Sequence, residues 1–361
     1  MAKKSMVVVH IIIFLLGLGI TLSTLFSAIK ETVLPGRKRV RLSRVVFRNT
    51  FRLFRFVAVR VQDDALRDRI LALYAPISVM LLPLTWVILL IIGVSAMFWA
   101  VGVASPERAM TLSGAALTTE GFFPPQGAAE TILYIISGII GLGIVGLLIT
   151  FLPTIYAVYS QREQEVTRVA IRFGAPPSGV KVLEQVYQSG LAQELNDLWH
   201  SWEEWFTAMY ETHLSNIEVI FYRSAEPGTS WITTAGALLD ACALFSSTVD
   251  QQDDPWLKLC FRAGCHTLLD IANDLNASFD PNLAPGETIH VTHAEYAAAC
   301  EQLRRADVPL KLDQEASWRA FVNLRSQYDV TLLALAYMIY APESPWSSDR
   351  KPGSLKRKQI K

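Results

Sequence analysis

Charged residues are missing from three long stretches of this 361-residue chain, and their absence excludes an ordinary soluble protein. Met6 to Ile29 holds only His10 as a titratable side chain, and residues 70–106 and 131–161 hold no charged residue. Each stretch exceeds the roughly 20 apolar residues that a spanning helix needs. The first is also longer than the roughly 7–15-residue apolar core of a signal peptide. The sequence therefore predicts three membrane helices, the first of them uncleaved.

Motifs of catalysis are missing as well. The chain has no phosphate-binding loop, kinase motif, catalytic triad or Gly-x-Ser-x-Gly elbow, so we predict that it is not an enzyme and expect no nucleic-acid partner. Residues 141–146 match G-x-G-x-x-G, but a dinucleotide fingerprint follows a strand in a soluble unit, whereas these lie within an apolar stretch. We expect no cofactor.

Cysteine is scarce, with four residues in the whole chain. Cys260, Cys265 and His266 lack the spacing and the second cysteine pair of a common zinc site, so no metal site is predicted. We expect free thiols, because all four cysteines follow the third apolar stretch, in a part of the chain assigned below to the cytoplasm. They are Cys242, Cys260, Cys265 and Cys300.

Charge is unevenly distributed, although the net charge is zero. Segment 30–69 contains 12 Lys+Arg against 4 Asp+Glu. The positive-inside rule places this segment in the cytoplasm, with the amino terminus and the loop 105–128 outside and everything after the third helix inside. The expected localisation is a bacterial inner (plasma) membrane, crossed several times.

Arginines recur at intervals of three or four residues in the basic segment, which places them in one narrow stripe of a helix beside Phe47, Phe51 and Phe54. The favoured interpretation is an interfacial helix whose guanidinium groups meet anionic lipid headgroups. The alternative is a voltage sensor, which normally belongs to a longer set of spanning helices than this chain offers. The stripe consists of Arg41, Arg44, Arg48, Arg52 and Arg55.

A short helix is predicted between the second and third apolar stretches. Ser105 is a favourable N-cap, Pro106 a favourable first residue and Glu107 an acid in the first turn. A helix from Pro106 to Thr118 measures roughly 19 Å, about half a bilayer, and its partially negative carbonyl end favours a cation at the membrane centre. The alternative is a three-helix anchor whose external loop happens to be rich in threonine.

Residues 77–160 resemble the two-helix pore module of tetrameric potassium channels and related cation channels. In that family the pore helix ends in a Thr-Thr-Val-Gly-Tyr/Phe-Gly-Asp filter, whose carbonyl oxygens replace the water around the ion. The resemblance implies a homotetramer, a permeant monovalent cation with K+ as the candidate, and no other cofactor. The residues in register with the filter are Thr118, Thr119, Glu120, Gly121, Phe122, Phe123 and Pro124.

Three of these residues depart from the family pattern. Phe123 replaces a glycine, and phenylalanine tolerates a positive φ poorly. Glu120 replaces a valine, so that four carboxylates in a tetramer either line the path as an acidic ring or bond to the pore helix behind the filter. Pro124 replaces the aspartate. The resemblance therefore implies cation permeation without strict potassium selectivity.

The third apolar stretch, predicted as a helix from about residue 130 to 159, is rich in glycine. Pore-lining helices of the family use glycine as a hinge, and Pro153 would add a kink near the inner mouth. Close packing explains the glycines equally well, and the sequence leaves both interpretations open. The candidate hinge or gate residues are Gly138, Gly141, Gly143, Gly146 and Pro153.

Beyond the third stretch the pattern predicts a soluble helical region. This region resembles a domain found behind pore modules in predicted bacterial ion-channel membrane proteins, which implies no established activity. Its His, Arg and acidic residues fit either a ligand or pH-responsive pocket or, preferably, hydrogen-bonded partners between packed helices. The only strand candidate is 218–222. Predicted helices are 180–197, 201–216, 231–246, 256–276, 293–305 and 314–338.

The expected fold is an all-α membrane protein with three transmembrane helices, a re-entrant pore helix and loop, and a C-terminal helical cytoplasmic domain. Two functions fit it: a tetrameric cation channel, or a membrane-anchored sensor or scaffold whose cytoplasmic region binds a partner or an unknown ligand. The expected divisions are an N-terminal membrane helix (1–30), a basic linker (31–70), a pore module (71–160), a cytoplasmic domain (161–346) and a disordered basic tail (347–361).

Overall fold

The computed structural model describes residues 2–33, 41–58, 60–61, 63–226, 228–252, 254–277 and 288–350. These residues are helical or irregular, without a strand, and three of the helices are long and apolar enough to cross a membrane. The candidate spans are Met6–Thr32, Arg69–Ala100 and Ala128–Phe173. The predicted helical class is thereby confirmed, and each of the three predicted stretches forms a helix that is long and apolar enough to cross a membrane. Most of the expected basic tail, from residue 351 onward, lies outside the described residues.

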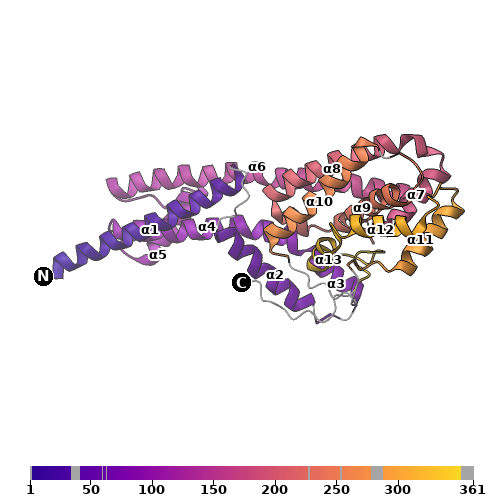
Figure 1. Ribbon diagram of the computed structural model, residues 1–361. Helices are drawn as coiled ribbons and strands as arrows, with labels where there is room; N and C mark the ends of the chain where they lie inside the picture. Colours follow the sequence, from indigo (N-terminus) through magenta and orange to yellow (C-terminus); the bar gives the residue numbers. More distant parts are fainter. Residues whose placement is uncertain are drawn as a thin grey trace. The chain divides into compact units, whose positions relative to one another are not determined.

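The chain forms two compact units, Met1–Ala157 and Val158–Lys361. The described residues of the first unit form five complete helices and the beginning of a sixth, which Figure 1 labels. They are α1 (Ala2–Thr32), α2 (Arg41–Ala58), α3 (Asp64–Ala72), α4 (Tyr74–Ala100), α5 (Pro106–Thr118) and α6 (Ala128–Phe173).

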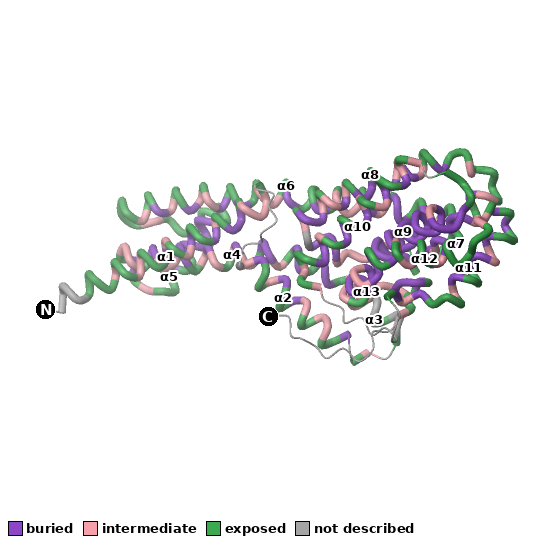
Figure 2. Tube along the Cα trace, in the orientation of Figure 1, coloured by how far each residue is buried: buried purple, intermediate pink, exposed green. Residues whose placement is uncertain are grey.

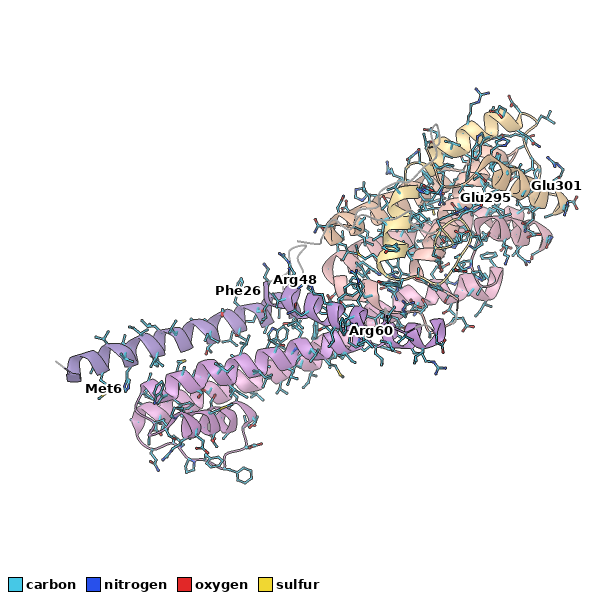
Figure 3. The ribbon with its side chains drawn as sticks, turned by 90° about the horizontal axis from the view of Figure 1, so that it is seen from below. Met6, Phe26, Arg48, Arg60, Glu295 and Glu301 are labelled. Atoms are coloured by element: carbon cyan, nitrogen blue, oxygen red, sulfur yellow. The ribbon has the colours of Figure 1, made fainter. Side chains whose placement is uncertain are left out.

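Helix α1 packs closely on α4 at two glycines. A Cβ atom on Gly17 would stand 2.5 Å from the carbonyl oxygen of Gly93, and one on Gly93 would stand 2.9 Å from that of Gly17. Small residues of this kind let two helix backbones approach each other in a membrane. Elsewhere on α1 large apolar side chains are exposed, from Met6 to Phe26 (Figure 3). The first candidate membrane helix, α1, therefore packs against the next one, α4, a point that the sequence left open.

The bounds of the two later spans differ from those predicted. Helix α4 is shorter than the uncharged stretch 70–106 and begins at Tyr74. Pro76 falls in its first turn, where a missing N–H costs little. Helix α6 was expected to end near 159 but continues to Phe173. It passes through Pro153 and ends before Gly174, which has a φ of +86°.

The second unit is a helical domain around α9 (Trp231–Thr248). Nearly every residue of α9 is buried (Figure 2), and α7, α10, α12 and α13 all pack against it. The other elements are α7 (Gly179–Gln188), η1 (Leu191–Glu194), α8 (Leu195–Ser215), η2 (Ile217–Phe221), α10 (Pro255–Leu275), α11 (His293–Arg305), α12 (Gln314–Arg325) and α13 (Asp329–Met338).

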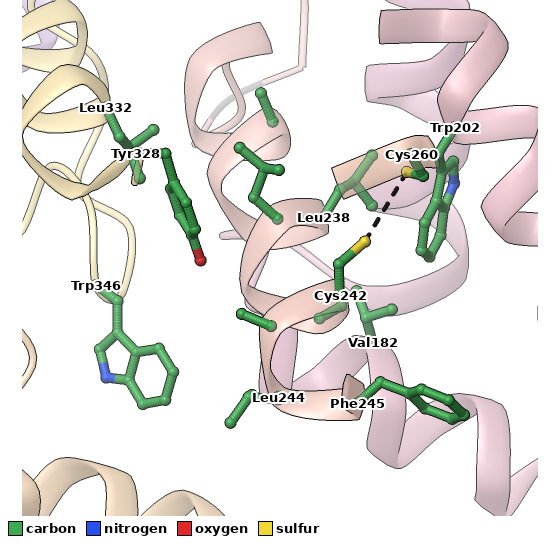
Figure 4. Close-up of a cluster of buried hydrophobic side chains, with 14 of the residues drawn as sticks. Val182, Trp202, Leu238, Cys242, Leu244, Phe245, Cys260, Tyr328, Leu332 and Trp346 are labelled. Carbon is green, nitrogen blue, oxygen red and sulfur yellow. Dashed lines mark hydrogen bonds between the residues drawn. The ribbon is translucent and has the colours of Figure 1, made fainter. Parts of the chain in front are cut away.

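The core of this unit contains aromatic rings and thiols (Figure 4). The ring of Trp199 lies with its centroid 5.1 Å from Trp202 and 5.6 Å from Phe245, in edge-to-face geometry. The sulfurs of Cys242 and Cys260 are 3.8 Å apart, and all four cysteines are free thiols. Burial raises the pKa of Cys265 to about 12, so this thiol stays protonated at neutral pH.

Three predictions in the second unit are wrong. The expected helix 180–197 is divided at Gly190, whose φ of +70° ends the regular helix. The expected helix 314–338 is divided at residues 326–328 into α12 and α13. The expected strand 218–222 is the 3-10 helix η2: Val219 and Ile220 are fully buried, and the carbonyl oxygen of Ile220 accepts the indole N–H of Trp231 at 2.9 Å. The strand-like alternation thus comes from burial in a helical core.

Candidate functional site

Helix α5 begins and ends where the sequence predicts, at Pro106 and Thr118. The Ser105 hydroxyl accepts the backbone N–H of Arg108 at 3.2 Å, Pro106 occupies the first turn, and Glu107 lies beside the free N–H groups. This combination provides a partner for one of the unpaired N–H groups and places a negative charge near the others, which stabilises the N-terminal end of a short helix.

One face of α5 lies along α4 (Figure 1). The buried hydroxyl of Ser113 donates to the carbonyl oxygen of Ile91 at 2.9 Å, and Ala109 and Leu112 are buried on the same side. Ile91 precedes the end of α4 by nine residues, or roughly 14 Å of helix. Contact with α4 therefore reaches well inside the apolar part of that helix.

The carbonyl end of α5 contacts α6 at a glycine. The carbonyl oxygen of Leu117 occupies the space that a Cβ atom on Gly141 would need, and that of Ala116 would lie 3.5 Å from a Cβ on Gly138. Gly141 follows Ala128, the first residue of α6, by thirteen residues, or roughly 20 Å. Helix α5 thus ends alongside the middle of the apolar part of α6.

A tight turn follows α5. Thr119 adopts a left-handed conformation with a φ of +59°, and the N–H groups of Thr119 and Glu120 donate to the carbonyl oxygens of Ala116 and Ala115. This is the Schellman pattern of a helix C-terminus. Gly121 is also left-handed, at +76°. Two positive φ values within three residues direct the chain away from the axis of α5.

Every residue of the filter-like segment is exposed on the single subunit, including Phe122 at 78% and Phe123 at 49%. Phe123 is not among the described residues with a positive φ, so its replacement of glycine brings no backbone strain here. The carboxylate of Glu120 is exposed and makes no hydrogen bond with α5 in the described part of the chain. The segment comprises Thr118, Thr119, Glu120, Gly121, Phe122 and Phe123.

The candidate hinge residues of α6 fall into two groups. Gly138 and Gly141 face the end of α5, whereas Gly143 and Gly146 have no atom within 4 Å of a Cβ position. Pro153 lies inside a continuous helix. Packing explains Gly141, whereas a Cβ on Gly138 would make only an ordinary van der Waals contact. The second pair lies on a face of α6 that is exposed on the single subunit.

The predicted arginine stripe lies on α2. Arg44, Arg48 and Arg52 are exposed and Arg55 is half-buried, while the side chain of Arg41 lies outside the described atoms. Figure 3 labels Arg48 on α2 and Arg60 just beyond the helix.

A buried charge cluster in the second unit was missed by sequence reasoning. The fully buried guanidinium of Arg325 donates to Asp240 on α9 and to Asp329 on α13, the latter at 2.8 Å. The hydroxyl of Tyr328 donates to Asp240 at 2.7 Å, and the backbone N–H of His290 donates to Asp329 at 3.1 Å. Burial raises the pKa of Asp240 to about 6, against the opposing effect of Arg325. Asp240, an acidic residue within the apolar sequence of α9, was the only local sign of this cluster.

The His and Arg side chains that suggested a pocket are embedded in the packing of the second unit. His213 is fully buried, and no described atom bonds its Nε2; burial, followed by the charge of Arg162, lowers its pKa well below the usual range. Arg162 donates to the carbonyl oxygens of Val219 and Tyr222 at 2.7 and 2.9 Å. Arg223 donates to those of Ile339 and Tyr340 at 3.1 and 2.9 Å. Among the described residues, no group of His, Cys, Asp or Glu could hold a metal ion.

The fold therefore defines a class: an all-helical protein with three helices suited to cross a membrane and a fourth, short helix between the second and third. The chain matches no protein-family model, no curated protein and no solved structure.

Proposed function

We propose that the protein is a homotetrameric cation channel in which α5 is a re-entrant pore helix. In this proposal residues 118–123 form the narrow part of the ion path, and α6 lines the pore. The permeant ion is a monovalent cation, with K+ as the candidate.

One observation carries the proposal: the carbonyl oxygen of Leu117 lies on Gly141, roughly 20 Å along α6 from its first residue. If α6 spans the bilayer from near its N-terminal end, that point lies more than halfway through a hydrocarbon core of about 30 Å. The nine residues 119–127 then return the chain to the surface, a distance within their extended reach of about 30 Å. Irregular backbone at such depth requires surrounding protein or water.

Exposure of the filter-like segment supports several copies around an axis. Phe122 and Phe123 would face lipid or water on a lone subunit, together with the Thr118 and Thr119 hydroxyls and the Glu120 carboxylate. One loop per chain forms a closed path only when symmetric copies surround it. The partially negative ends of four α5 helices and a ring of Glu120 carboxylates would favour cations over anions.

The charge distribution supports an orientation for this channel. The basic segment that contains α2 lies in the cytoplasm under the positive-inside rule, with the loop around α5 outside and the second unit inside, in a bacterial inner membrane. Gating would involve α6, where Gly143, Gly146 and Pro153 are not committed to packing against α5.

Ion flux through vesicles that contain the purified full chain tests the proposal. We expect cation flux from the wild type and an altered cation preference from Glu120→Gln. Gly121→Ala should reduce flux, because alanine is strained at a φ of +76°. Glu107→Gln is the matched control, since it removes the same charge at the opposite, exposed end of α5. If Glu120→Gln and Gly121→Ala both behave like the wild type, the loop is not the filter. A monomer without flux would favour the membrane-anchored scaffold instead.

A further inference from the structure

Helix α2 has three distinct faces, of which the first is packed. Phe47 is buried there, and its carbonyl oxygen accepts the hydroxyl of Tyr74, the first residue of α4, at 3.3 Å. The rings of Phe51 and Phe54 lie 5.3 and 6.0 Å from that of Tyr74, edge to face. This face fixes α2 at the beginning of a candidate membrane span, Arg69–Ala100.

The second face carries uncompensated positive charge. Arg44, Arg48 and Arg52 are exposed, and none of them forms an ion pair with a described residue. Helix α2 itself contains no acidic residue. Arginines three or four positions apart repel one another on a helix, so an anionic partner would stabilise this face.

The third face is apolar and also exposed. Val45, Leu53, Phe56 and Val57 are 43%, 62%, 58% and 41% exposed, and their spacing places them next to the arginines on the helix surface. A contiguous apolar surface beside a basic stripe is the pattern of a helix that lies in the membrane interface.

We propose that α2 is an anionic-lipid site: its apolar face enters the boundary between headgroups and acyl chains, and Arg44, Arg48 and Arg52 bind lipid phosphates. Two observations favour lipid over a second copy of the chain. The contact with Tyr74 holds α2 at the end of a spanning helix, where the bilayer surface lies. A second copy would also bring its own arginine stripe toward the first, with no acidic residue on α2 to offset the repulsion.

Thiol labelling of the full chain in nanodiscs tests this site. The Leu53→Cys variant is exposed to a membrane-impermeant maleimide in nanodiscs of phosphatidylcholine alone and of phosphatidylcholine with phosphatidylglycerol. We expect labelling to be at least about tenfold slower when phosphatidylglycerol is present, because each arginine near an anionic surface contributes on the order of 1 kcal/mol. Leu312→Cys is the matched control: Leu312 is fully exposed in the second unit, and its labelling should not respond to lipid composition.

A second variant, which carries the Leu53→Cys label site but lacks the arginine charges, tests whether these charges cause the effect. With Arg44→Gln, Arg48→Gln and Arg52→Gln combined, the effect of phosphatidylglycerol on position 53 should disappear. The same number of exposed arginines removed elsewhere, by Arg304→Gln, Arg305→Gln and Arg319→Gln, should leave it intact. Equal labelling in both lipids, or protection that depends on protein concentration and not on lipid, would overturn the proposal. Neither readout requires ion flux, so it stands or fails separately from the channel.

Discussion

Leu117 places its carbonyl oxygen directly over Gly141, in the space that any β-carbon at this position would occupy. The contact joins the end of the short helix α5 to the middle of the apolar part of α6. Glycine is required here by the approach of a carbonyl group and not by backbone flexibility, since Gly141 has helical geometry. This relationship connects the turn after α5 with a position along a helix that is long and apolar enough to cross a membrane.

Replacement of Gly141 by alanine should displace α5. The added methyl group overlaps the backbone of Leu117, and overpacking of this kind costs about 1–3 kcal/mol. We expect a lower melting temperature of the full chain in detergent and reduced flux. Gly143→Ala is the control, because a Cβ at Gly143 meets no atom; it should leave the melting temperature unchanged. If the two variants melt alike, the contact between α5 and α6 does not stabilise the protein.

Replacement of Gly17 by alanine should loosen α1 from α4. A Cβ there would stand 2.5 Å from the backbone oxygen of Gly93, which cannot move aside without displacing the helix. We expect destabilisation of about 1–3 kcal/mol, measured as thermal unfolding in detergent. Gly19→Ala, on the same helix but with open space around its Cβ position, should be neutral. An equally stable Gly17→Ala variant would show that the close approach of the two helices is unimportant.

Replacement of Arg325 by methionine should strongly destabilise the second unit. The change leaves the carboxylates of Asp240 and Asp329 buried without their cation, and removal of one partner of a buried pair costs about 3–5 kcal/mol. Chemical unfolding of the full chain, followed by tryptophan fluorescence, measures this loss. Arg319→Met, at an exposed position of the same helix, should change stability by less than about 0.5 kcal/mol. A small effect at Arg325 would mean that the cluster is open to water.

His213 should lower the stability of the second unit in acid, whereas Asp240, whose pKa burial raises to about 6, acts in the opposite direction below about that pH. Burial, reinforced by the charge of Arg162, lowers the pKa of His213 well below 6.5 in the folded protein. Below about pH 6.5 the unfolded chain therefore binds a proton that the folded chain does not, and the free energy of unfolding decreases by up to about 1.4 kcal/mol per pH unit. Above that pH the contribution is constant. Melting temperatures measured from about pH 5 to about pH 7.5 show the slope.

His213→Leu should flatten this slope, whereas His293→Gln, at an exposed position, should not. The same pH dependence in the wild type and in His213→Leu would assign acid sensitivity to other groups.

Local sequence signals were sufficient to predict the bounds of α5. Ser105, Pro106 and Glu107 specify its start, and the left-handed Thr119 and Gly121 follow its end. The apolar stretches likewise predicted three spanning segments, because a bilayer imposes a length and a composition that one window of sequence can contain. The exposure of the filter-like residues could be read only from the structure, since it depends on how α5 packs.

Contacts between distant residues could not be predicted. Arg325 lies 85 residues from Asp240, and no local pattern pairs them. Burial also misled the strand prediction at 218–222, where apolar side chains fill a core from a 3-10 helix. The breaks within the predicted helices 180–197 and 314–338 were missed because the apolar periodicity continues across the short turns that divide them. Gly190, with its positive φ, was the one available warning.

Electron cryomicroscopy of the full chain in lipid nanodiscs tests the proposed channel most directly, because it reveals both the number of copies and the direction that residues 118–122 face. We predict four subunits around one axis, with these residues closest to it, α5 within the bilayer and a continuous water-accessible path. A single subunit, or an assembly in which residues 118–122 lie on the external surface away from the axis, would contradict the account.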